Sequence, residues 1–433
     1  MGRGAGGHDT VARPTVAYVL HPDLKSAAKR RLPEHGLAEA VSLASALPGL
    51  TVAGAQVVRI ARLQPATLMG SGKVDELKAT FAGLGVELVL FDGPVSPVQQ
   101  RNLEKAWGAK VLDRTGLILE IFADRARTRE GVLQVELAAL SWQRTRLVRA
   151  WTHLERQRGG FGFVGGPGET QIESDRRAID DQVIRLKRQL DRVGRTRELH
   201  RASRRKVPFP LVALVGYTNA GKSTLFNRMT GADVLAKDML FATLDPTMRG
   251  VVLPSGRKVI ASDTVGFISD LPTQLVAAFR ATLDEVLEAD LICHVRDISH
   301  PETAEQALDV AEILAALGVG TATPMIEVWN KLDLVDGTAR DALVAQAAQR
   351  DTVHAVSALT GEGVAALLAA IALAFEEVRS EETLILPFAD GRARARLHRL
   401  GVVVGETAGE VEYSVTVRWT DRQKAQWQAD QPA

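Results

Sequence analysis

Cysteine and long apolar runs are scarce in this sequence, and each scarcity excludes a class of protein. A single cysteine, Cys293, occurs among the 433 residues, which excludes a disulfide framework and a metal cluster built from cysteines. Because Cys293 lies inside an apolar run, we expect it to be a small core residue. The most apolar stretch, residues 363–375, is too short to span a bilayer, and the N-terminus lacks the apolar segment of a secretory signal. We therefore expect a cytoplasmic protein without a membrane span.

An excess of charge of one sign is also lacking. The 53 lysines and arginines nearly balance the 52 aspartates and glutamates, giving a net charge of +1, so the total charge indicates no partner. Residues 144–206 differ from this average, because they hold 17 basic and 8 acidic side chains. Such a local excess is typical of a surface that binds a polyanion. A helical spacer exposed to water can be equally rich in charge, so both interpretations stay open.

Hydrophobic patterning predicts an α/β multidomain protein. Residues 15–125 alternate short apolar runs with amphipathic stretches, which is the pattern of a compact α/β domain. After residue 207 a similar alternation predicts a doubly wound sheet, with its ligand at the carboxyl ends of the strands. The predicted parts are a disordered tail at 1–14, an N-terminal α/β domain at 15–125, a helical hairpin at 126–206, a nucleotide-binding domain at 207–380 and a small α+β domain at 381–433.

The hairpin prediction rests on two heptad patterns separated by a glycine-rich loop. Apolar residues recur at spacings of four and three through residues 133–154 and again through 179–193, which predicts two helices packed antiparallel. The loop between them, residues 159–168, has six glycines in ten positions. It also contains Phe161 and Phe163, and exposed aromatic rings among basic residues can stack on unpaired bases. The two rings therefore favour RNA over a mere spacer.

One stretch organises the second half of the chain. The apolar run at residues 212–215 leads directly into Gly216-x-x-x-x-Gly221-Lys222-Ser223, and a helical pattern follows. This sequence of strand, loop and helix is what a phosphate-binding loop requires. The two glycines allow successive backbone N–H groups to point at the β- and γ-phosphates. Lys222 adds a full positive charge, and Ser223 offers a ligand for Mg²⁺.

A second glycine-rich segment, Gly70-Ser71-Gly72-Lys73, looks like a fragment of such a loop. Thr67 stands where the first glycine of the motif would be, and no clear strand precedes it. We favour a turn before a helix, with a second nucleotide site as the alternative.

A further motif, Asp263-Thr264-Val265-Gly266, follows the strand expected at 259–262. A carboxylate at that position reaches Mg²⁺, usually through water, and the backbone N–H of Gly266 can contact the γ-phosphate.

Asn330-Lys331-Leu332-Asp333 follows the strand expected at 325–329. This motif indicates which nucleotide base the protein binds. The Asp333 carboxylate can accept hydrogen bonds from the ring N–H and the exocyclic amine of guanine together. Adenine offers no such pair, and each charge-assisted bond lost would cost about 1.5–3 kcal/mol. The motif therefore favours GTP over ATP by roughly one to three orders of magnitude. Ser357-Ala358 is a weaker candidate for a backbone contact to the guanine oxygen.

In this order and spacing, the motifs resemble those of regulatory GTPases of the translation-factor class. The segment from Phe241 to Thr247 narrows the resemblance to the HflX family, and makes Thr243 the threonine that closes on Mg²⁺ and the γ-phosphate. Arg296 departs from the family pattern, which usually has an apolar residue there, and leaves the burial of that strand end open. The resemblance extends to residues 113–115, 121–123, 134–137, 166–171 and 175–177, and so covers residues 15–380.

The resemblance implies a GTP hydrolase that binds the large ribosomal subunit and its RNA through the tip of the hairpin, and that separates stalled or stressed 70S ribosomes. It implies GTP as substrate and Mg²⁺ as cofactor. Potassium-dependent GTPases that resemble this chain carry an asparagine at the position of Asn219, which places K⁺ against the phosphates; the alternative is that Asn219 only shapes the loop. We expect a monomer that does not bind DNA. The alternatives are a GTP-regulated factor of RNA or ribosome maturation, and an RNA-binding adaptor that only senses nucleotide.

Phe267 stands where many GTPases place the glutamine that orients the attacking water. A phenyl ring offers that water no donor or acceptor, so we expect the free protein to hydrolyse GTP slowly and the ribosome to stimulate it. The alternative is that another side chain, such as Thr264, positions the water unaided.

The predicted catalytic residues are Lys222, Thr243 and Gly266, and the predicted metal ligands are Ser223 and Thr243. The residues predicted to contact the nucleotide are Gly216, Tyr217, Thr218, Asn219, Ala220, Gly221, Lys222, Ser223 and Thr224 of the loop; Phe241, Ala242, Thr243, Leu244 and Asp245; Asp263, Thr264, Val265 and Gly266; Asn330, Lys331, Leu332 and Asp333; and Ser357 and Ala358.

Overall fold

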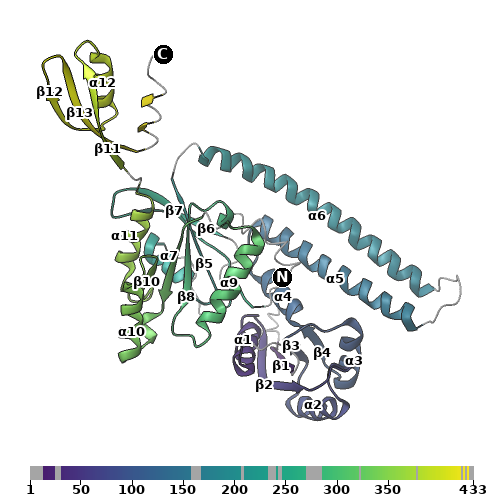
Figure 1. Cartoon of the computed structure of the whole chain (residues 1–433). Coiled ribbons are helices and arrows are strands. Elements are labelled where there is room, and N and C mark those ends of the chain that lie inside the picture. The colour runs from purple at the N-terminus through teal and green to yellow at the C-terminus, as the bar shows by residue number, and fades with distance from the viewer. Residues whose placement is uncertain are drawn as a thin grey trace, which may run out of the picture. The chain divides into compact units, whose positions relative to one another are not determined.

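The computed structural model of the chain is shown in Figure 1. It describes residues 13–24, 31–157, 167–205, 209–232, 240–241, 246–269, 285–320, 323–376, 379–420, 423–424 and 427–428, with the backbone alone for 148–157, 167–172, 194–205 and 379. Residue contacts divide the chain into two compact units, 1–369 and 370–433. Most of the predicted disordered tail, residues 1–12, lies outside the described residues.

The N-terminal part of the first unit is an α/β sandwich around a parallel sheet. Its described strands pair in the order β2-β1-β3-β4, all parallel. In chain order the elements are β1 (Thr15–Leu24), α1 (Pro33–Ser45), β2 (Leu50–Ile60), α2 (Ser71–Leu84), β3 (Leu88–Phe91), α3 (Pro97–Trp107), β4 (Lys110–Asp113) and α4 (Arg114–Arg125).

Alternation along β1 assigns helices to the two faces of this sheet. Ala17 and Val19 belong to a buried cluster with residues of α1 and α4, whereas Tyr18 and Leu20 belong to a second cluster with residues of α2 and α3. Successive side chains of a strand point to opposite faces, so α1 and α4 cover one face and α2 and α3 the other. The face that bears α1 and α4 is the one that continues toward the nucleotide domain.

The two long helices α5 (Arg129–Gln157) and α6 (Pro167–Arg205) lie side by side (Figure 1). Leu133 and Leu186 are buried along them, as their heptad positions require. Arg144 of α5 forms an ion pair with Asp180 of α6 at 2.7 Å, and the two residues lie about equally far from the helix ends that face each other. The helices are therefore antiparallel. The tip of the loop, residues 158–166, lies outside the described residues.

The nucleotide domain is built on a sheet in the order β10-β9-β8-β5-β7-β6 among the described strands. Its neighbours are parallel except β6, which pairs antiparallel with β7 at the edge. The chain leaves β5 for one side and later returns to β8 on the other, so a topological switch point lies at the carboxyl end of β5. The elements are β5 (Leu211–Gly216), α7 (Lys222–Thr230), β6 (Thr247–Val252), β7 (Lys258–Asp263), β8 (Leu291–Asp297), α9 (Thr303–Leu317), β9 (Met325–Asn330), η1 (Leu332–Leu334), α10 (Gly337–Ala348), β10 (Val353–Ala355) and α11 (Val364–Ala374).

The second unit holds a small α+β domain, as predicted. Its described strands form an antiparallel sheet in the order β11-β13-β12, and one helix packs on it. Leu397 of the helix and Trp419 and Trp427 belong to its buried core. The elements are β11 (Arg379–Pro387), α12 (Gly391–Arg399), β12 (Val403–Ala408) and β13 (Glu412–Thr420).

Among the described helices, none has both the length and the apolarity that a membrane crossing requires.

Candidate nucleotide-binding site

The phosphate loop joins β5 to α7 at the switch point of the sheet, and two of its positions accept glycine only. At Gly216 φ is +156°, and an added Cβ would lie 2.1 Å from the carbonyl oxygen of Val295. At Gly221 φ is +87°, and an added Cβ would lie 2.2 Å from Nδ2 of Asn330. A side chain at either position would collide with its neighbour. The sequence motif therefore corresponds to a real constraint of the backbone.

Lys222 opens α7 and lies in a buried place suited to an anion. Its ammonium donates hydrogen bonds to the carbonyl oxygens of Gly216 at 3.2 Å and Tyr217 at 2.9 Å. Burial lowers the pKa of Lys222 to about 8, although the Asp263 carboxylate opposes this shift. A phosphate at the helix N-terminus would favour the charged form, because its negative charge would compensate for the hydration that the buried ammonium has lost.

Ser223 and Asp263 meet at the position expected for Mg²⁺. The Ser223 hydroxyl donates to Oδ2 of Asp263 at 2.7 Å, and Asp263 ends β7 fully buried. A hydroxyl and a carboxylate are the hard oxygen donors that Mg²⁺ prefers, so these residues fit the ion. Among the described residues, no group of three or more His, Cys, Asp or Glu side chains is suited to hold a metal.

The segment after β7 is held against the phosphate loop by its backbone. The N–H of Thr218 donates to the carbonyl of Phe267 at 2.7 Å, and the N–H of Phe267 donates to the carbonyl of Gly216 at 3.1 Å. Gly266 consequently lies so close that an added Cβ would be 2.8 Å from Cα of Thr218 and 3.0 Å from Nζ of Lys222. The segment after β7 therefore lies directly against the phosphate loop and Lys222. Val265 is buried beside Gly266.

Thr264 and Phe267 both point away from water. Thr264 is fully buried, and its hydroxyl donates to the carbonyl of Leu214 at 2.7 Å. The Phe267 side chain is 2% exposed and belongs to the core cluster that also holds Tyr217 and Phe241.

Asn330 ties the base-binding segments to the phosphate loop. Its amide donates to the carbonyl of Ala220 at 2.8 Å, and its Oδ1 accepts from the N–H of Ala358 at 2.9 Å. Asp333 lies next to this link, because Ser357 donates from Oγ to Oδ1 of Asp333 at 2.5 Å. Three segments far apart in sequence, those of Ala220, Asn330 to Asp333, and Ser357 to Ala358, therefore meet at one place. The bridging role of the Asn330 amide has no signal in the sequence beyond the motif itself.

The remaining predicted residues are distributed as follows. Asn219 has φ +59° and is exposed, and Thr224 lies in the first turn of α7. Lys331 has φ +64° and forms an ion pair with Asp297 at 2.8 Å, while Leu332 is buried. Phe241 is buried against Phe122, with ring centroids 4.7 Å apart. Ala242, Thr243, Leu244 and Asp245 lie outside the described residues.

Arg296 lies at a strand end that is partly buried. Its side chain is 15% exposed, forms an ion pair with Glu327 of β9 and donates to the carbonyl of Thr303 at 3.2 Å. A basic residue is accommodated there because an acidic partner stands on the neighbouring strand.

Sequence reasoning missed a set of side chains that reaches this site from the N-terminal part. The Tyr217 hydroxyl of the phosphate loop donates to Glu39 of α1 and accepts from the N–H of Ser269. Glu39 is also bound by Arg114. Glu39 had no signal in the sequence, and Arg114 was singled out only as part of a family-like segment.

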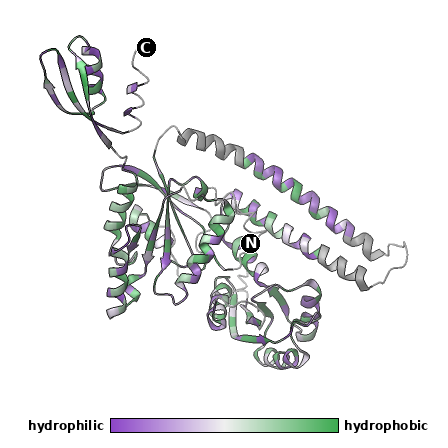
Figure 2. Cartoon of the chain, viewed as in Figure 1, coloured by the Kyte–Doolittle hydropathy of each residue, from purple (hydrophilic) through white to green (hydrophobic). Residues whose placement is uncertain are grey.

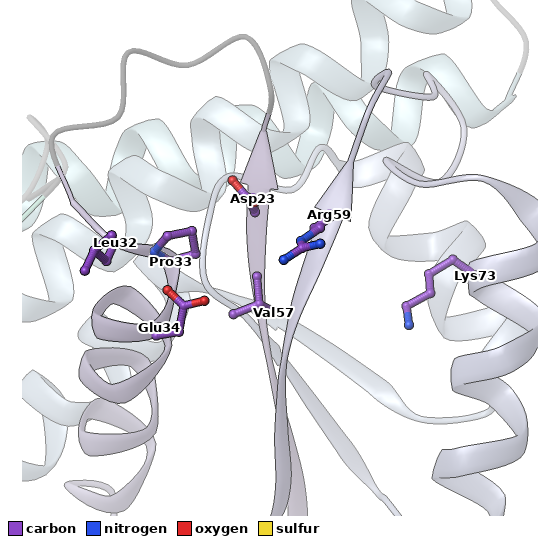
Figure 3. A pocket seen from close by; sticks show the side chains of 7 residues that line it. All are labelled: Asp23, Leu32, Pro33, Glu34, Val57, Arg59 and Lys73. Atoms are coloured by element: carbon purple, nitrogen blue, oxygen red, sulfur yellow. The ribbon is translucent and has the colours of Figure 1, made fainter.

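The glycine-rich segment at residues 70–73 begins α2, with Gly70 as its N-cap, and no described strand leads into it. It therefore has the structure of a turn before a helix. Lys73 nevertheless lines a cavity of about 630 Å³. Figure 3 shows Asp23 and Arg59 on the neighbouring strands β1 and β2, with Lys73 reaching from α2 and Glu34 from the start of α1. The lining combines two acids with two bases and so selects no single charge of ligand.

Known protein families and proteins resemble this sequence over most of its length. The sequence matches three family profiles, described as "GTP-binding GTPase N-terminal" over residues 34–123, "GTP-binding GTPase Middle Region" over 125–204 and "50S ribosome-binding GTPase" over 211–331. GTPase HflX of Magnetococcus marinus is 50% identical over 403 residues, which cover 93% of this chain and 91% of that protein. GTPase HflX of Escherichia coli is 45% identical over 342 residues, covering 79% and 80%. Among solved structures, the SsGBP and GDP complex is 23% identical with a TM-score of 0.47, covering 83% of this chain and 98% of that one, a likeness too distant to bear on function.

Proposed function

The chain belongs to the HflX family of GTPases, and from this membership we propose that it is a Mg²⁺-dependent GTPase that binds the large ribosomal subunit and separates stalled or stressed 70S ribosomes. GTP hydrolysis itself is the activity of the family. The observation that carries the ribosomal part is the match of residues 211–331 to a family described as ribosome-binding. Ribosomes lie in the cytoplasm, which is where we place its action.

The geometry supports the following roles. Lys222 and the loop N–H groups bind the β- and γ-phosphates, the N–H of Gly266 contacts the γ-phosphate, and Asp333 accepts from guanine. Ser223 would hold Mg²⁺, with Asp263 beside it, and the ion would neutralise charge on the phosphates. Thr243, which the resemblance makes a further ligand, lies outside the described residues.

Neither of the two residues predicted from the sequence to decide this step, Phe267 and Thr264, offers a group free to position the attacking water. Phe267 has no polar group and is buried. The Thr264 hydroxyl is already committed to the carbonyl of Leu214, which weakens the alternative that Thr264 orients the water unaided. We therefore propose that a partner completes the catalytic arrangement, and that turnover reports docking on the ribosome.

The charge that supports an RNA partner belongs to residues 144–206 as a whole, which hold 17 basic and 8 acidic side chains. Over residues 173–193, where the side chains of α6 are described, six basic and five acidic side chains are interspersed, and all six basic ones are exposed. In Figure 2 the coloured middle part of α6 is mostly in the colour of hydrophilic residues. Exposed cations along one element suit a phosphate backbone better than a protein core.

Sedimentation through a sucrose gradient tests this function. The protein is mixed with large subunits and either GDP or a non-hydrolysable GTP analogue, in Mg²⁺. We expect co-migration with the subunit in the analogue and little in GDP, together with a fall in the 70S peak when GTP and intact ribosomes are used. Co-migration without loss of 70S ribosomes would favour a maturation factor, and migration independent of nucleotide would favour an adaptor.

A further inference from the structure

The Glu39 carboxylate is the centre of a polar network that joins four segments of the first unit. Its Oε2 accepts from the Tyr217 hydroxyl of the phosphate loop, and its Oε1 accepts from the Ser269 hydroxyl at 2.8 Å. Arg114 at the start of α4 donates to the same Oε1 at 2.5 Å, and Arg31 donates to Oε2 at 3.2 Å. The side chain of Glu39 is 13% exposed and that of Arg114 is 9% exposed. Most of the network is therefore shielded from water, where such bonds are strong.

The same groups also bind each other around Glu39. The N–H of Ser269 donates to the Tyr217 hydroxyl at 2.8 Å, and Arg114 donates to the carbonyl of Ser269 at 3.0 Å. Burial, followed by the charge of Glu39, raises the pKa of Tyr217, so its hydroxyl stays protonated and donates. Ser269 is thus held at its N–H, its carbonyl and its hydroxyl.

Ser269 follows Gly266 by three residues, which connects the network to the γ-phosphate position. Between them, Phe267 is joined to the phosphate loop by two backbone hydrogen bonds. The segment 266–269 is therefore fixed at two points: by the backbone at Phe267 and by side chains at Ser269. Loss of the second point would let the segment pivot about Phe267. The N–H of Gly266 would then no longer lie in a fixed place beside Lys222.

We infer that Glu39 is a positioning residue for the recognition of GTP, which acts through Tyr217 and Ser269 to hold Gly266 where it binds the γ-phosphate. The inference rests on the proposed contact between Gly266 and that phosphate. It makes the N-terminal domain part of the apparatus that distinguishes GTP from GDP. GDP has no γ-phosphate, so its binding does not use the network.

The test measures the affinities of the full-length chain for a fluorescent GDP and a fluorescent non-hydrolysable GTP analogue. Glu39→Gln removes the charge that binds two arginines and two hydroxyls. We expect it to weaken binding of the GTP analogue on the order of tenfold and to change GDP binding by less than about twofold. Ser269→Ala removes only one hydroxyl, so it should shift the ratio of affinities in the same direction by a smaller factor. If Glu39→Gln does not fold, the same ratio of affinities is measured in Ser269→Ala instead.

Glu104→Gln is the matched control. Glu104 is a carboxylate of the same domain whose Oε1 accepts from the N–H of Val111 at 3.1 Å, and no hydrogen bond joins it to Arg114, Tyr217 or Ser269 among the described residues. This variant should keep the wild-type ratio of GTP to GDP affinity. Equal changes of the ratio in Glu104→Gln and Glu39→Gln would mean a merely structural role and would overturn the inference.

Two further variants separate the possible failures. The double variant Glu39→Gln/Ser269→Ala should change the ratio of affinities no more than Glu39→Gln does, because both changes break the same contact between Glu39 and Ser269. Fully additive effects of the two changes would contradict the inference. Gly266→Ala tests the premise, since an added Cβ would press on Thr218. If Gly266→Ala binds the GTP analogue like the wild type, the proposed γ-phosphate contact is wrong. If it weakens that binding while Glu39→Gln does not, only the role of Glu39 fails.

Discussion

Asp333 is the residue on which the choice of base depends. Its Oδ1 accepts a hydrogen bond from Ser357, which orients the carboxylate and leaves acceptor capacity for guanine. Asp333→Asn removes the charge and replaces one acceptor by a donor. We expect GTP binding to weaken by roughly 10- to 100-fold, as the loss of one charge-assisted bond predicts, and xanthosine triphosphate, with a carbonyl in place of the amine, to bind better than to the wild type.

Direct titration with both nucleotides measures this change of specificity. Asp336→Asn is the control, because Asp336 is an exposed carboxylate three residues away that precedes α10. It should bind GTP like the wild type. Unchanged GTP affinity in Asp333→Asn would remove Asp333 from the base site.

Asn219 offers a second prediction at the level of a single side chain. Its φ of +59° lies in the left-handed region, which asparagine tolerates better than most residues. Asn219 therefore has two possible roles: it stabilises the conformation of the loop, or it binds a K⁺ ion next to the phosphates. A cation there would offset the charge that builds during phosphoryl transfer. If it serves the ion, hydrolysis in KCl should exceed that in NaCl at equal ionic strength.

Asn219→Gly distinguishes the two roles, because glycine keeps the left-handed backbone and removes the amide. We expect the variant to bind GTP and to lose most of the stimulation by K⁺. Equal rates of the wild type in the two salts, or full stimulation of the glycine variant, would show that Asn219 only shapes the loop.

At the level of elements, the sequence predicted best what is local. The phosphate loop, the Asp263 segment and the Asn330 segment each follow an apolar run that became a strand. No predicted apolar run covered β4 or β6. Only two of the four residues of β4 are buried, and β6 is an antiparallel edge strand with three of its six residues exposed. Neither strand has the continuous apolar run from which a buried strand is predicted.

The network around Glu39 shows why part of the site was beyond prediction. Glu39 binds Tyr217 across 178 positions and Ser269 across 230 positions of the chain. Such contacts depend on how the face of the N-terminal sheet that carries α1 packs near β5. Periodicity within a window reports only which face is buried, not which distant residue it meets.

Strand β8 gives a prediction at this scale, because it places a histidine in the core of the sheet. Burial lowers the pKa of His294 to about 4, from an ordinary value of 6.5, despite attraction from Glu327; Arg296 and Lys222 act in the same direction as burial. The folded chain therefore keeps His294 neutral at a pH where the unfolded chain takes up a proton. Stability should fall as the pH drops from about 6.5 to about 4, by up to about 3 kcal/mol from this residue.

The urea midpoint of unfolding, measured between pH 7.5 and pH 4, checks this effect of pH. His294→Gln cannot titrate, so its midpoint should fall less over that range than the midpoint of the wild type. His398→Gln, at an exposed site on α12, should follow the wild type. A pH dependence of His294→Gln equal to that of the wild type would mean that His294 is not buried as a neutral ring.

Across the whole first unit, one buried cluster runs from the N-terminal sheet into the nucleotide domain. It contains Ala40 and Leu43 of α1, Ile118 of α4, and Phe241 and Phe267 beside the phosphate site. A core shared in this way makes the nucleotide site sensitive to anything that displaces the N-terminal domain. The hairpin follows α4 directly in the chain. A partner that binds and displaces the hairpin would therefore shift α4, and through the shared core it would shift Phe267.

The prediction for the whole molecule is that GTP turnover is slow alone and rises when large ribosomal subunits are present. The expectation follows from the burial of Phe267 and the commitment of the Thr264 hydroxyl to Leu214, which leave the water to be positioned by the partner. Deleting residues 160–167 from the hairpin loop should leave GTP binding intact, because the phosphate loop is a separate element. It should remove most of the stimulation.

Multiple-turnover rates with and without large subunits, for the wild type and two loop variants, decide the matter. In the second variant a Gly-Ser segment of equal length replaces residues 160–167, so that reach is kept while Phe161 and Phe163 are lost. If the rings stack on unpaired bases, this variant should be stimulated as weakly as the deletion. If the Gly-Ser variant is stimulated like the wild type, the loop contributes its length to ribosome binding and does not act through contacts of its aromatic rings with bases. A high intrinsic rate that subunits do not change would rule out gating by the ribosome, and would place the water-positioning group within the chain.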